Sequence, residues 1–286
     1  MDSIRSLVPE WIRTLTPYPP GMPIEELERE LGIQGSIKLA SNENPLGPSP
    51  RALAAVTAAL ATLHRYPDGS AFYLKRRLAE RLGVRPDELL IGNGSNEIIE
   101  LVVRTFMRPH DEAVMADQAF VIYRMVVQSV GGSARIVPLR DYTHDLEALA
   151  EAVTPRTRVV FLANPNNPTG TIFGRAAWEA FLAALPRHLV VVADDAYAEY
   201  VEDPEYPDTI RERADDEEHV ARTLAVNREG MAFLVEGFRR LRLSWVPSAF
   251  RKRSFSSGRP TVTRRCSGKP YASIGRTITP RRRSAW

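Results

Sequence analysis

Glycine and small polar residues gather in the segment GNGSNE, residues 92–97, which follows a short apolar run and opens a helical pattern. Glycine lets a backbone approach a ligand closely, and the free amides at the start of a helix favour a phosphate. Gly94, Ser95 and Asn96 would line such a phosphate cup. An ordinary glycine turn, in which Ser95 caps the helix, explains this segment equally well when it is taken alone.

A second polar segment, NPNNPTG, spans residues 164–170 and follows the apolar run at 157–163. Its prolines and glycine predict a rigid loop at the C-terminal end of a strand, where open α/β sheets bind ligands. Asn167 could present its side-chain amide to a ligand oxygen there. The alternative is a loop built only from turn-forming residues. We favour the ligand contact, because a plain loop requires fewer constrained residues than these.

The third segment is VVVADDAY, residues 190–197, in which Asp194 ends the most hydrophobic predicted strand. If Asp194 faced a pyridine nitrogen, the charge-assisted pair would keep the ring protonated, which suits an electron sink. The alternative is that Asp194 or Asp195 caps the next helix. Tyr197 could reach a phenolic oxygen of the same ring, or it could be a packed aromatic residue.

Two further aromatic residues stand near these segments. Phe120 follows the predicted strand at 112–116 and could stack on a planar ring, or it could belong to the core. Tyr66 lies in the turn HRYPDG, residues 64–69, where its hydroxyl could serve a phosphate or simply face solvent. The five histidines show no metal-ligand spacing, and the single cysteine, Cys266, excludes an internal disulfide and a cysteine-based metal site.

An alternation of short apolar runs and helical patterns must position these residues. The predicted strands are 88–91, 112–116, 134–138, 157–163 and 188–194, and the predicted helices are 49–63, 70–82, 95–107, 120–130, 145–153 and 174–185. This order predicts an α/β fold with a mostly parallel sheet that helices cover on both faces. Residues 1–45 are predicted to form an extended arm. The apolar spacing over 216–241 predicts an amphipathic helix.

The charge of the chain changes abruptly near Phe250. Residues 251–286 contain eleven Lys and Arg and no Asp or Glu, whereas residues 1–250 carry a net charge of −8. The tail lacks periodic apolar positions, so we expect it to be disordered. It prompts the hypothesis of a nucleic-acid binder, which we rank last because no RNA- or DNA-binding motif accompanies the tail. The chain has no apolar run of transmembrane length and no signal-peptide core, so we expect a cytoplasmic protein.

Five segments of the chain together resemble the histidinol-phosphate aminotransferases, which are fold-type-I pyridoxal-phosphate enzymes. The segments are LASNENPLGPSP (39–50), RYPDG (65–69), GNGSNEIIE (92–100), NPNNPTG (164–170) and DDAYAEY (194–200). The last but one marks the wider aminotransferase superfamily. The first two narrow the resemblance to the histidinol-phosphate branch and close relatives such as threonine-phosphate decarboxylases. The resemblance covers roughly residues 8–249.

The resemblance implies a cofactor, pyridoxal 5′-phosphate, and a role for each residue above. It also implies a homodimer, because Tyr66 would reach the phosphate bound by the neighbouring subunit. The implied contacts are Gly94, Ser95, Asn96 and Tyr66 for the phosphate, Phe120 for the ring face, Asn167 and Tyr197 for the ring oxygen, Asp194 for the ring nitrogen and Asn42 for the substrate.

The sequence departs from this family in the stretch that should carry the Schiff-base lysine. The family has a Ser-Lys pair after the DDAYAEY segment, but here residues 206–210 run directly into RERADDEEHVARTL at 211–224. The four lysines of the chain are Lys38, Lys75, Lys252 and Lys269, and none stands in the expected context. The family sheet has seven strands, so the absent stretch predicts that two are missing between 88–91 and 157–163. The phosphate cup would then shift roughly 10 Å against the ring contacts.

We therefore predict four regions: an N-terminal arm and small-domain segment (1–45), a truncated cofactor-binding large domain (46–210), the start of a small C-terminal domain (211–250) and a basic tail (251–286). The first hypothesis is an aminotransferase that acts on histidinol phosphate and 2-oxoglutarate in histidine biosynthesis. The second is a non-catalytic remnant or pseudogene product. A threonine-phosphate decarboxylase-like enzyme ranks behind both. We expect weak or absent cofactor binding and no transamination, because no lysine is available for the covalent bond.

Overall fold

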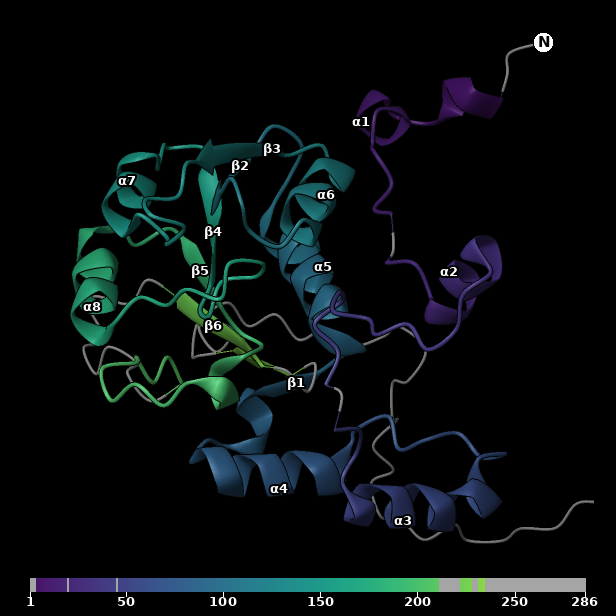
Figure 1. Cartoon of the computed structure of the whole chain (residues 1–286). Coiled ribbons are helices and arrows are strands. Elements are labelled where there is room, and N and C mark those ends of the chain that lie inside the picture. The colour runs from purple at the N-terminus through teal and green to yellow at the C-terminus, as the bar shows by residue number, and fades with distance from the viewer. Residues whose placement is uncertain (1–3, 20, 45, 211–221, 228–230, 235–286) are drawn as a thin grey trace, which may run out of the picture. The chain divides into compact units, whose positions relative to one another are not determined.

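The centre of the protein is a seven-stranded sheet with the strand order β1-β7-β6-β5-β4-β2-β3. It is seen in a computed structural model that describes residues 4–19, 21–44, 46–210, 222–227 and 231–234 (Figure 1). The strands are β1 (Leu89–Ile91), β2 (Glu112–Ala116), β3 (Ser133–Val137), β4 (Thr157–Ala163), β5 (Val190–Asp195), β6 (Arg222–Asn227) and β7 (Met231–Leu234). Only the pairs of β7, with β1 and with β6, are antiparallel.

Helices cover both faces of this sheet, as the continuous apolar runs of β4 and β5 require. On one face, α5 (Gly94–Phe106) and α6 (Ile122–Ser129) pack against Val159, Phe161, Val190 and Val192. On the other, α7 (Leu146–Glu151) and α8 (Arg175–Ala184) pack against the alternate residues of the same strands. Figure 1 shows α5 and α6 to the right of the strands and α7 and α8 to the left.

The remaining helices precede the sheet in the chain. They are α1 (Glu10–Arg13), α2 (Ile24–Leu31), α3 (Pro50–Ala59) and α4 (Phe72–Leu82), with 3-10 turns at Ile4–Leu7, Leu60–Thr62 and Pro86–Glu88 and a later one at Ala198–Tyr200. Short helices therefore interrupt the N-terminal segment that was predicted to be an extended arm. The arm is anchored where the Gln128 side-chain amide of α6 donates to the Trp11 carbonyl at 3.0 Å.

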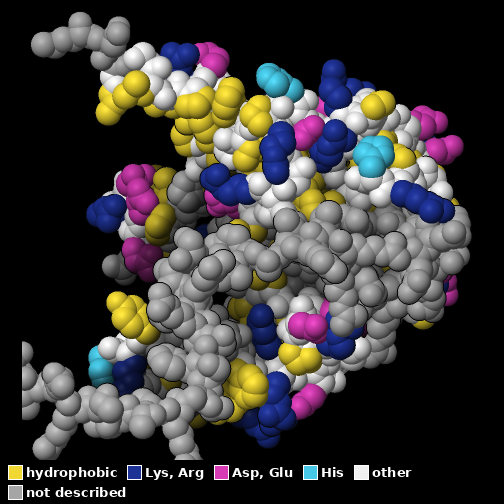
Figure 2. All heavy atoms as spheres, turned by 180° about the vertical axis from the view of Figure 1, so that it is seen from behind, with side chains coloured by type: hydrophobic (Ala, Val, Ile, Leu, Met, Phe, Trp, Pro, Cys, Tyr) yellow, Lys and Arg dark blue, Asp and Glu magenta, His cyan; other side chains and the backbone are white. Residues whose placement is uncertain are grey.

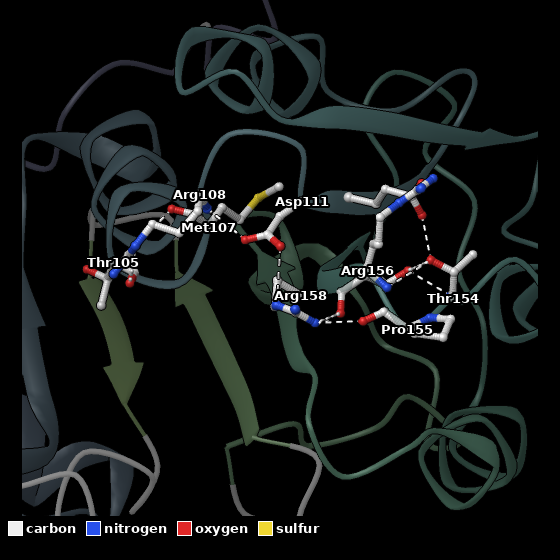
Figure 3. Close-up of polar contacts among 10 residues, drawn as sticks. Thr105, Met107, Arg108, Asp111, Thr154, Pro155, Arg156 and Arg158 are labelled. Atoms are coloured by element: carbon white, nitrogen blue, oxygen red, sulfur yellow. Dashed lines mark hydrogen bonds and ion pairs between the residues drawn. The ribbon is translucent and has the colours of Figure 1, made fainter.

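Charged residues fasten the edge of the sheet where β2 and β4 begin (Figure 3). Asp111 accepts a hydrogen bond from the Arg108 amide at 2.8 Å and forms an ion pair with Arg158. The next residue, Glu112, is buried and pairs with Arg156. A hydrogen bond from the Thr154 hydroxyl, aided by Arg156, lowers the pKa of Glu112 although burial opposes it. This network fixes the end of the sheet that lies opposite the carboxyl ends of β4 and β5.

The structure confirms the five strands and the helices that the sequence predicts between residues 49 and 195, with ends that differ by a few residues. The helix predicted over 216–241 is wrong in its described part, because β6 and β7 form there. The apolar spacing of this segment also fits a helix, but strand pairing decides its structure. β6 supplies hydrogen-bond partners from Val190 to Asp195 on the edge of β5 that does not pair with β4.

The expectation of a sheet with two missing strands is also wrong. β6 and β7 lie between β5 and β1, at the position where the gap was expected. Two strands thus follow residue 210 within the same sheet, and the other domain limits stay predictions. Residues 235–286, and with them the predicted basic tail at 251–286, lie outside the described residues. In the described part of the chain, no helix is long and apolar enough to cross a membrane.

Candidate active site

A cavity of about 470 Å³ opens where the carboxyl ends of β4 and β5 meet the loops that follow them. Its walls come from segments far apart in the chain. Six of the nine residues singled out from the sequence line it, namely Asn42, Ser95, Phe120, Asn167, Asp194 and Tyr197. The folded chain therefore brings together an acid, two amides, a hydroxyl, a phenol and an aromatic ring at one site.

Asp194 is the buried carboxyl group of this cavity. Its Oδ2 accepts a hydrogen bond from the Tyr123 hydroxyl at 2.6 Å, and its Oδ1 accepts one from the Ala196 amide at 3.2 Å. Burial raises the pKa of Asp194 to about 6, although both hydrogen bonds act to lower it. The following 3-10 turn begins after Tyr197 without a side-chain cap, so helix capping does not explain this carboxyl group.

Asp195 faces the other side of β5, because successive side chains of a strand alternate. Its carboxyl group accepts hydrogen bonds from the hydroxyl groups of Thr209 and Tyr206. Burial raises the pKa of Asp195 to about 8, and the charge of Asp194 adds to the shift. Asp195 therefore holds the segment after β5 and does not line the cavity.

Asn42 and Tyr197 meet across the mouth of the cavity. The side-chain amide of Asn42 donates to the Tyr197 hydroxyl at 3.2 Å. Ser41 and Asn42 both have positive φ, 73° and 50°, and this left-handed turn is tolerated by asparagine better than by most residues. The contact joins the N-terminal segment to the residues that follow β5.

The loop after β4 is held from both sides. The Asn166 amide donates to the Gln118 carbonyl at 2.9 Å and to the Thr169 hydroxyl at 2.8 Å. Asn164 exchanges two hydrogen bonds with the backbone of Phe173. Because its neighbours are fixed in this way, Asn167 lies half-buried on the cavity wall.

The start of α5 forms another wall. Ser95 lines the cavity, and the first-turn amides of a helix have no acceptor inside the helix, so they suit an anion. Gly94 has a φ of 74°, a conformation that favours glycine. Gly94 and Asn96 are exposed and do not line the cavity. Of the three residues predicted for the phosphate cup, Ser95 alone lines it.

Sequence reasoning missed three residues of this site. Tyr123 is fully buried beneath the cavity, and Tyr18 and Ser41 line its wall. Tyr123 lies three positions after Phe120 in the helix predicted over 120–130, but this spacing did not reveal the partner of its hydroxyl.

Tyr66 and the lysines lie apart from the cavity. Tyr66 is fully exposed. Among the described residues no lysine lines the cavity: Lys38 forms an ion pair with Glu43 at 2.9 Å, and Lys75 lies on α4. No group of three or more potential metal ligands occurs in the part of the chain that the structure describes.

The family described as aminotransferase class I and II matches residues 34–239. A histidinol-phosphate aminotransferase 2 of Pseudomonas aeruginosa is 41% identical over 306 aligned positions, which cover 87% of this chain and 83% of the relative. A histidinol-phosphate aminotransferase of Moorella thermoacetica is 51% identical over 201 positions, 70% of this chain and 52% of the relative. The crystal structure of a histidinol-phosphate aminotransferase from Sinorhizobium meliloti in complex with pyridoxal-5′-phosphate superimposes with a TM-score of 0.70 and 27% identity, over 80% of this chain and 63% of that one.

The coverage shows what this chain lacks. It spans about half of the Moorella relative and less than two thirds of the Sinorhizobium structure. In the Pseudomonas alignment, 87% of 286 residues is about 249, so at least about 57 of the 306 positions have no counterpart in this chain. The shorter Moorella alignment, 201 positions over 70% of the chain, needs no such gap. A relative of this chain thus contains an internal stretch that this chain does not.

Proposed function

The chain belongs to the aminotransferase class I and II family, and from that premise we propose that its cavity is a pyridoxal-phosphate site of the histidinol-phosphate type that lacks its lysine. The observation that carries this proposal is the buried Asp194 on the wall of a cavity that also presents Ser95, Phe120, Asn167 and Tyr197. These are an anion for a ring nitrogen, a helix start for a phosphate, a ring for stacking and two groups for a ring oxygen.

The residues present fit this cofactor in their chemistry. A buried carboxylate with a raised pKa is costly unless a cation or hydrogen-bond donor faces it, and a protonated pyridine nitrogen is both. The proposed phosphate position at Ser95 uses the amides and the dipole of a 13-residue helix. Gly94 and Asn96 stay proposed members of the phosphate site, and Tyr66 would act from a second subunit.

Each residue of the cavity would have one role toward the cofactor or the substrate. Asp194 would hold a proton on the ring nitrogen, Asn167 and Tyr197 would orient the ring by its oxygen, and Phe120 would cover one ring face. Asn42, which already contacts Tyr197, would border the substrate. When bound, pyridoxal phosphate supplies an electron sink for bonds at the amino-bearing carbon of a substrate.

The missing lysine limits what this site can do. Among the described residues no lysine is positioned to bond the cofactor covalently or to move a proton at the substrate carbon, and Lys252 and Lys269 do not stand in the sequence context that the family uses. We therefore propose that the chain descends from an aminotransferase, binds the cofactor weakly and does not transaminate. The gap in the Pseudomonas alignment supports the loss of an internal stretch. Because all seven strands are present in the sheet, the expected shift of about 10 Å between the phosphate cup and the ring contacts is not an argument against the site.

Histidinol phosphate and 2-oxoglutarate are the substrates that we propose for the ancestral reaction. The names of the Pseudomonas and Moorella relatives support histidinol phosphate and an aminotransferase reaction over a threonine-phosphate decarboxylase-like activity. Nucleic-acid binding stays the least favoured proposal. Figure 2 shows the face of the molecule opposite to the view of Figure 1. Over its described part, basic and acidic side chains are intermixed and form no patch of a single sign of charge.

A second copy of this chain is the partner that we propose. α3 has no buried residue, and apolar side chains around it are exposed, among them Leu53, Val56, Leu60 and Leu63. Figure 2 shows further hydrophobic side chains on the N-terminal arm, at the upper left. Large exposed apolar surface of this kind marks interaction sites. A homodimer would also bring Tyr66 of one copy to the site of the other.

A titration with pyridoxamine 5′-phosphate tests the site without requiring a lysine. We expect saturable binding of pyridoxamine phosphate. The dissociation constant of pyridoxal phosphate should lie within about tenfold of that of pyridoxamine phosphate, because neither compound forms a covalent bond at this site. Asp194→Asn should weaken binding about tenfold or more, since a charge-assisted hydrogen bond is lost. Asp195→Asn is the matched control and should bind as the unaltered protein does. Equal losses in the two variants, or no binding at all, would contradict the proposed site.

A further inference from the structure

Tyr123 touches two walls of the cavity at once, although it does not line it. Its hydroxyl donates to Asp194 Oδ2 at 2.6 Å, and its ring meets the Phe120 ring edge-to-face with centroids 5.7 Å apart. The ring also stacks on Phe161 of β4, with centroids 4.6 Å apart and planes 10° from parallel. Tyr123 is completely buried, so its place is set by α6 and the sheet.

We propose that Tyr123 is a positioning residue that fixes both the Asp194 carboxylate and the Phe120 ring for a planar, cationic heteroaromatic ligand. This inference rests on the proposed function for the identity of the ligand, but the contacts themselves do not depend on it. Stacking on Phe161 prevents the phenol from turning, so the hydroxyl selects one orientation of the carboxylate. The same ring, nearly perpendicular to the ring of Phe120, limits the tilt of Phe120.

The direction of this hydrogen bond matters for the charge of the site. A phenol that donates to a carboxylate stabilises its anionic form, which opposes the effect of burial on Asp194. The pKa of Tyr123 itself is raised by burial and by Asp194, so the phenol keeps its proton and remains the donor. Asp195 and Tyr197, on or after β5, also act on Tyr123. Tyr206, from the segment that follows, is itself affected: burial and then the charge of Asp195 raise its pKa, and Asp194 adds a smaller contribution.

The alternative is that Tyr123 merely fills the core. A core role requires the ring but not the hydroxyl, whereas a positioning role requires both. Tyr123→Phe separates them because it keeps the stacked ring and removes only the donor. Tyr206→Phe is the matched control: it removes a largely buried phenol that bonds the neighbouring carboxyl group, Asp195, on the other face.

The test is a carboxyl ¹³C NMR titration of the cofactor-free protein labelled at aspartate, with the Asp194 signal assigned by its loss in Asp194→Asn. Tyr123→Phe should raise the Asp194 midpoint by about one pH unit, and Tyr206→Phe should leave it in place. Site-specific 3,5-difluorotyrosine at position 123, a stronger donor, should lower it. An unchanged midpoint in Tyr123→Phe and with the fluorinated residue, or an equal shift in Tyr206→Phe, would overturn the proposal.

Binding of pyridoxamine phosphate is the second readout. At pH 6, Tyr123→Phe should bind about fivefold more weakly than the unaltered protein, because a smaller fraction of Asp194 is anionic. The loss should shrink as the pH rises. If the unaltered protein binds no pyridoxamine phosphate, the proposed function fails while the NMR result still decides the role of Tyr123. If Tyr123→Phe does not fold, the fluorinated protein decides it.

Discussion

Asp194 and Asp195 adjoin in the chain, but the alternation of β5 directs their carboxyl groups to opposite faces of the sheet. One lines the cavity and bonds Tyr123, and the other holds Thr209 and Tyr206. Residue types and their place after strands marked Asp194, Asn167 and Tyr197 as candidates, the family resemblance assigned them to one site, and all three line the cavity. They did not predict Tyr123, because a buried tyrosine on an apolar helix face looks like core until its hydroxyl partner is known.

Asp195 gives the stability of the protein a characteristic dependence on pH. Its pKa is about 8 in the folded chain and about 3.9 when unfolded, so the folded state holds a proton that the unfolded state releases. The contribution of Asp195 to the free energy of unfolding is fully present below about pH 4. It is lost as the pH rises to 8, by at most about 1.4 kcal/mol per pH unit.

Asp195→Asn should remove this slope. Denaturant unfolding of both proteins between pH 5 and 8 measures it, and the difference cancels the opposite contribution of His144, whose pKa burial lowers to about 4. A difference that does not change with pH would show that Asp195 does not titrate in this way.

At the scale of elements, each segment between residues 49 and 195 follows its own local pattern, and the sequence predicted nearly all of them. β6 and β7 were missed because their spacing also fits a helix, and long-range pairing with β5 and β1 decides the outcome. α3 is a different case. Its helix forms as predicted, and Ser49 caps it, yet no part of it is buried in one chain.

Two helix caps should therefore differ in their effect on stability. Asp145 accepts from the Ala148 amide at 3.1 Å and starts α7, which buries Leu146 and Leu149. Asp145→Ala should lower the free energy of unfolding by about 1 kcal/mol. Ser49→Ala removes the same kind of contact from the unburied α3, so the global value should stay within about 0.5 kcal/mol while helix content falls. Equal losses in denaturant unfolding would show that α3 is packed after all.

At the scale of the whole molecule, the exposed apolar side chains around α3 and on the arm are the support for the proposed homodimer. Sequence reasoning reached the homodimer only through family resemblance, since nothing in a single chain tells an exposed leucine at an interface from one in solvent. Tyr66 illustrates this limit: it is fully exposed, and its proposed role requires a neighbour.

Replacing Val56 and Leu60 together by glutamine should shift the protein from dimer to monomer in sedimentation equilibrium, because both side chains, on α3 and at its C-cap, are more than half exposed. Leu101→Gln is the control, since Leu101 is an exposed residue of α5 outside that surface. A protein that is monomeric before any substitution, or an equal shift in the control, would contradict the proposed interface.

The central claim is that a recognisable cofactor site persists without its lysine, and trapping with pyridoxal phosphate tests it most directly. The purified chain is incubated with the cofactor and reduced with borohydride, its lysines are mapped by mass spectrometry, and the unreduced protein is assayed with histidinol phosphate and 2-oxoglutarate. We predict no stoichiometric label on any of Lys38, Lys75, Lys252 and Lys269, and no turnover. Restoring the internal stretch of the Pseudomonas relative should create a single labelled lysine. Stoichiometric labelling of one lysine in the unaltered chain, together with turnover, would contradict the account.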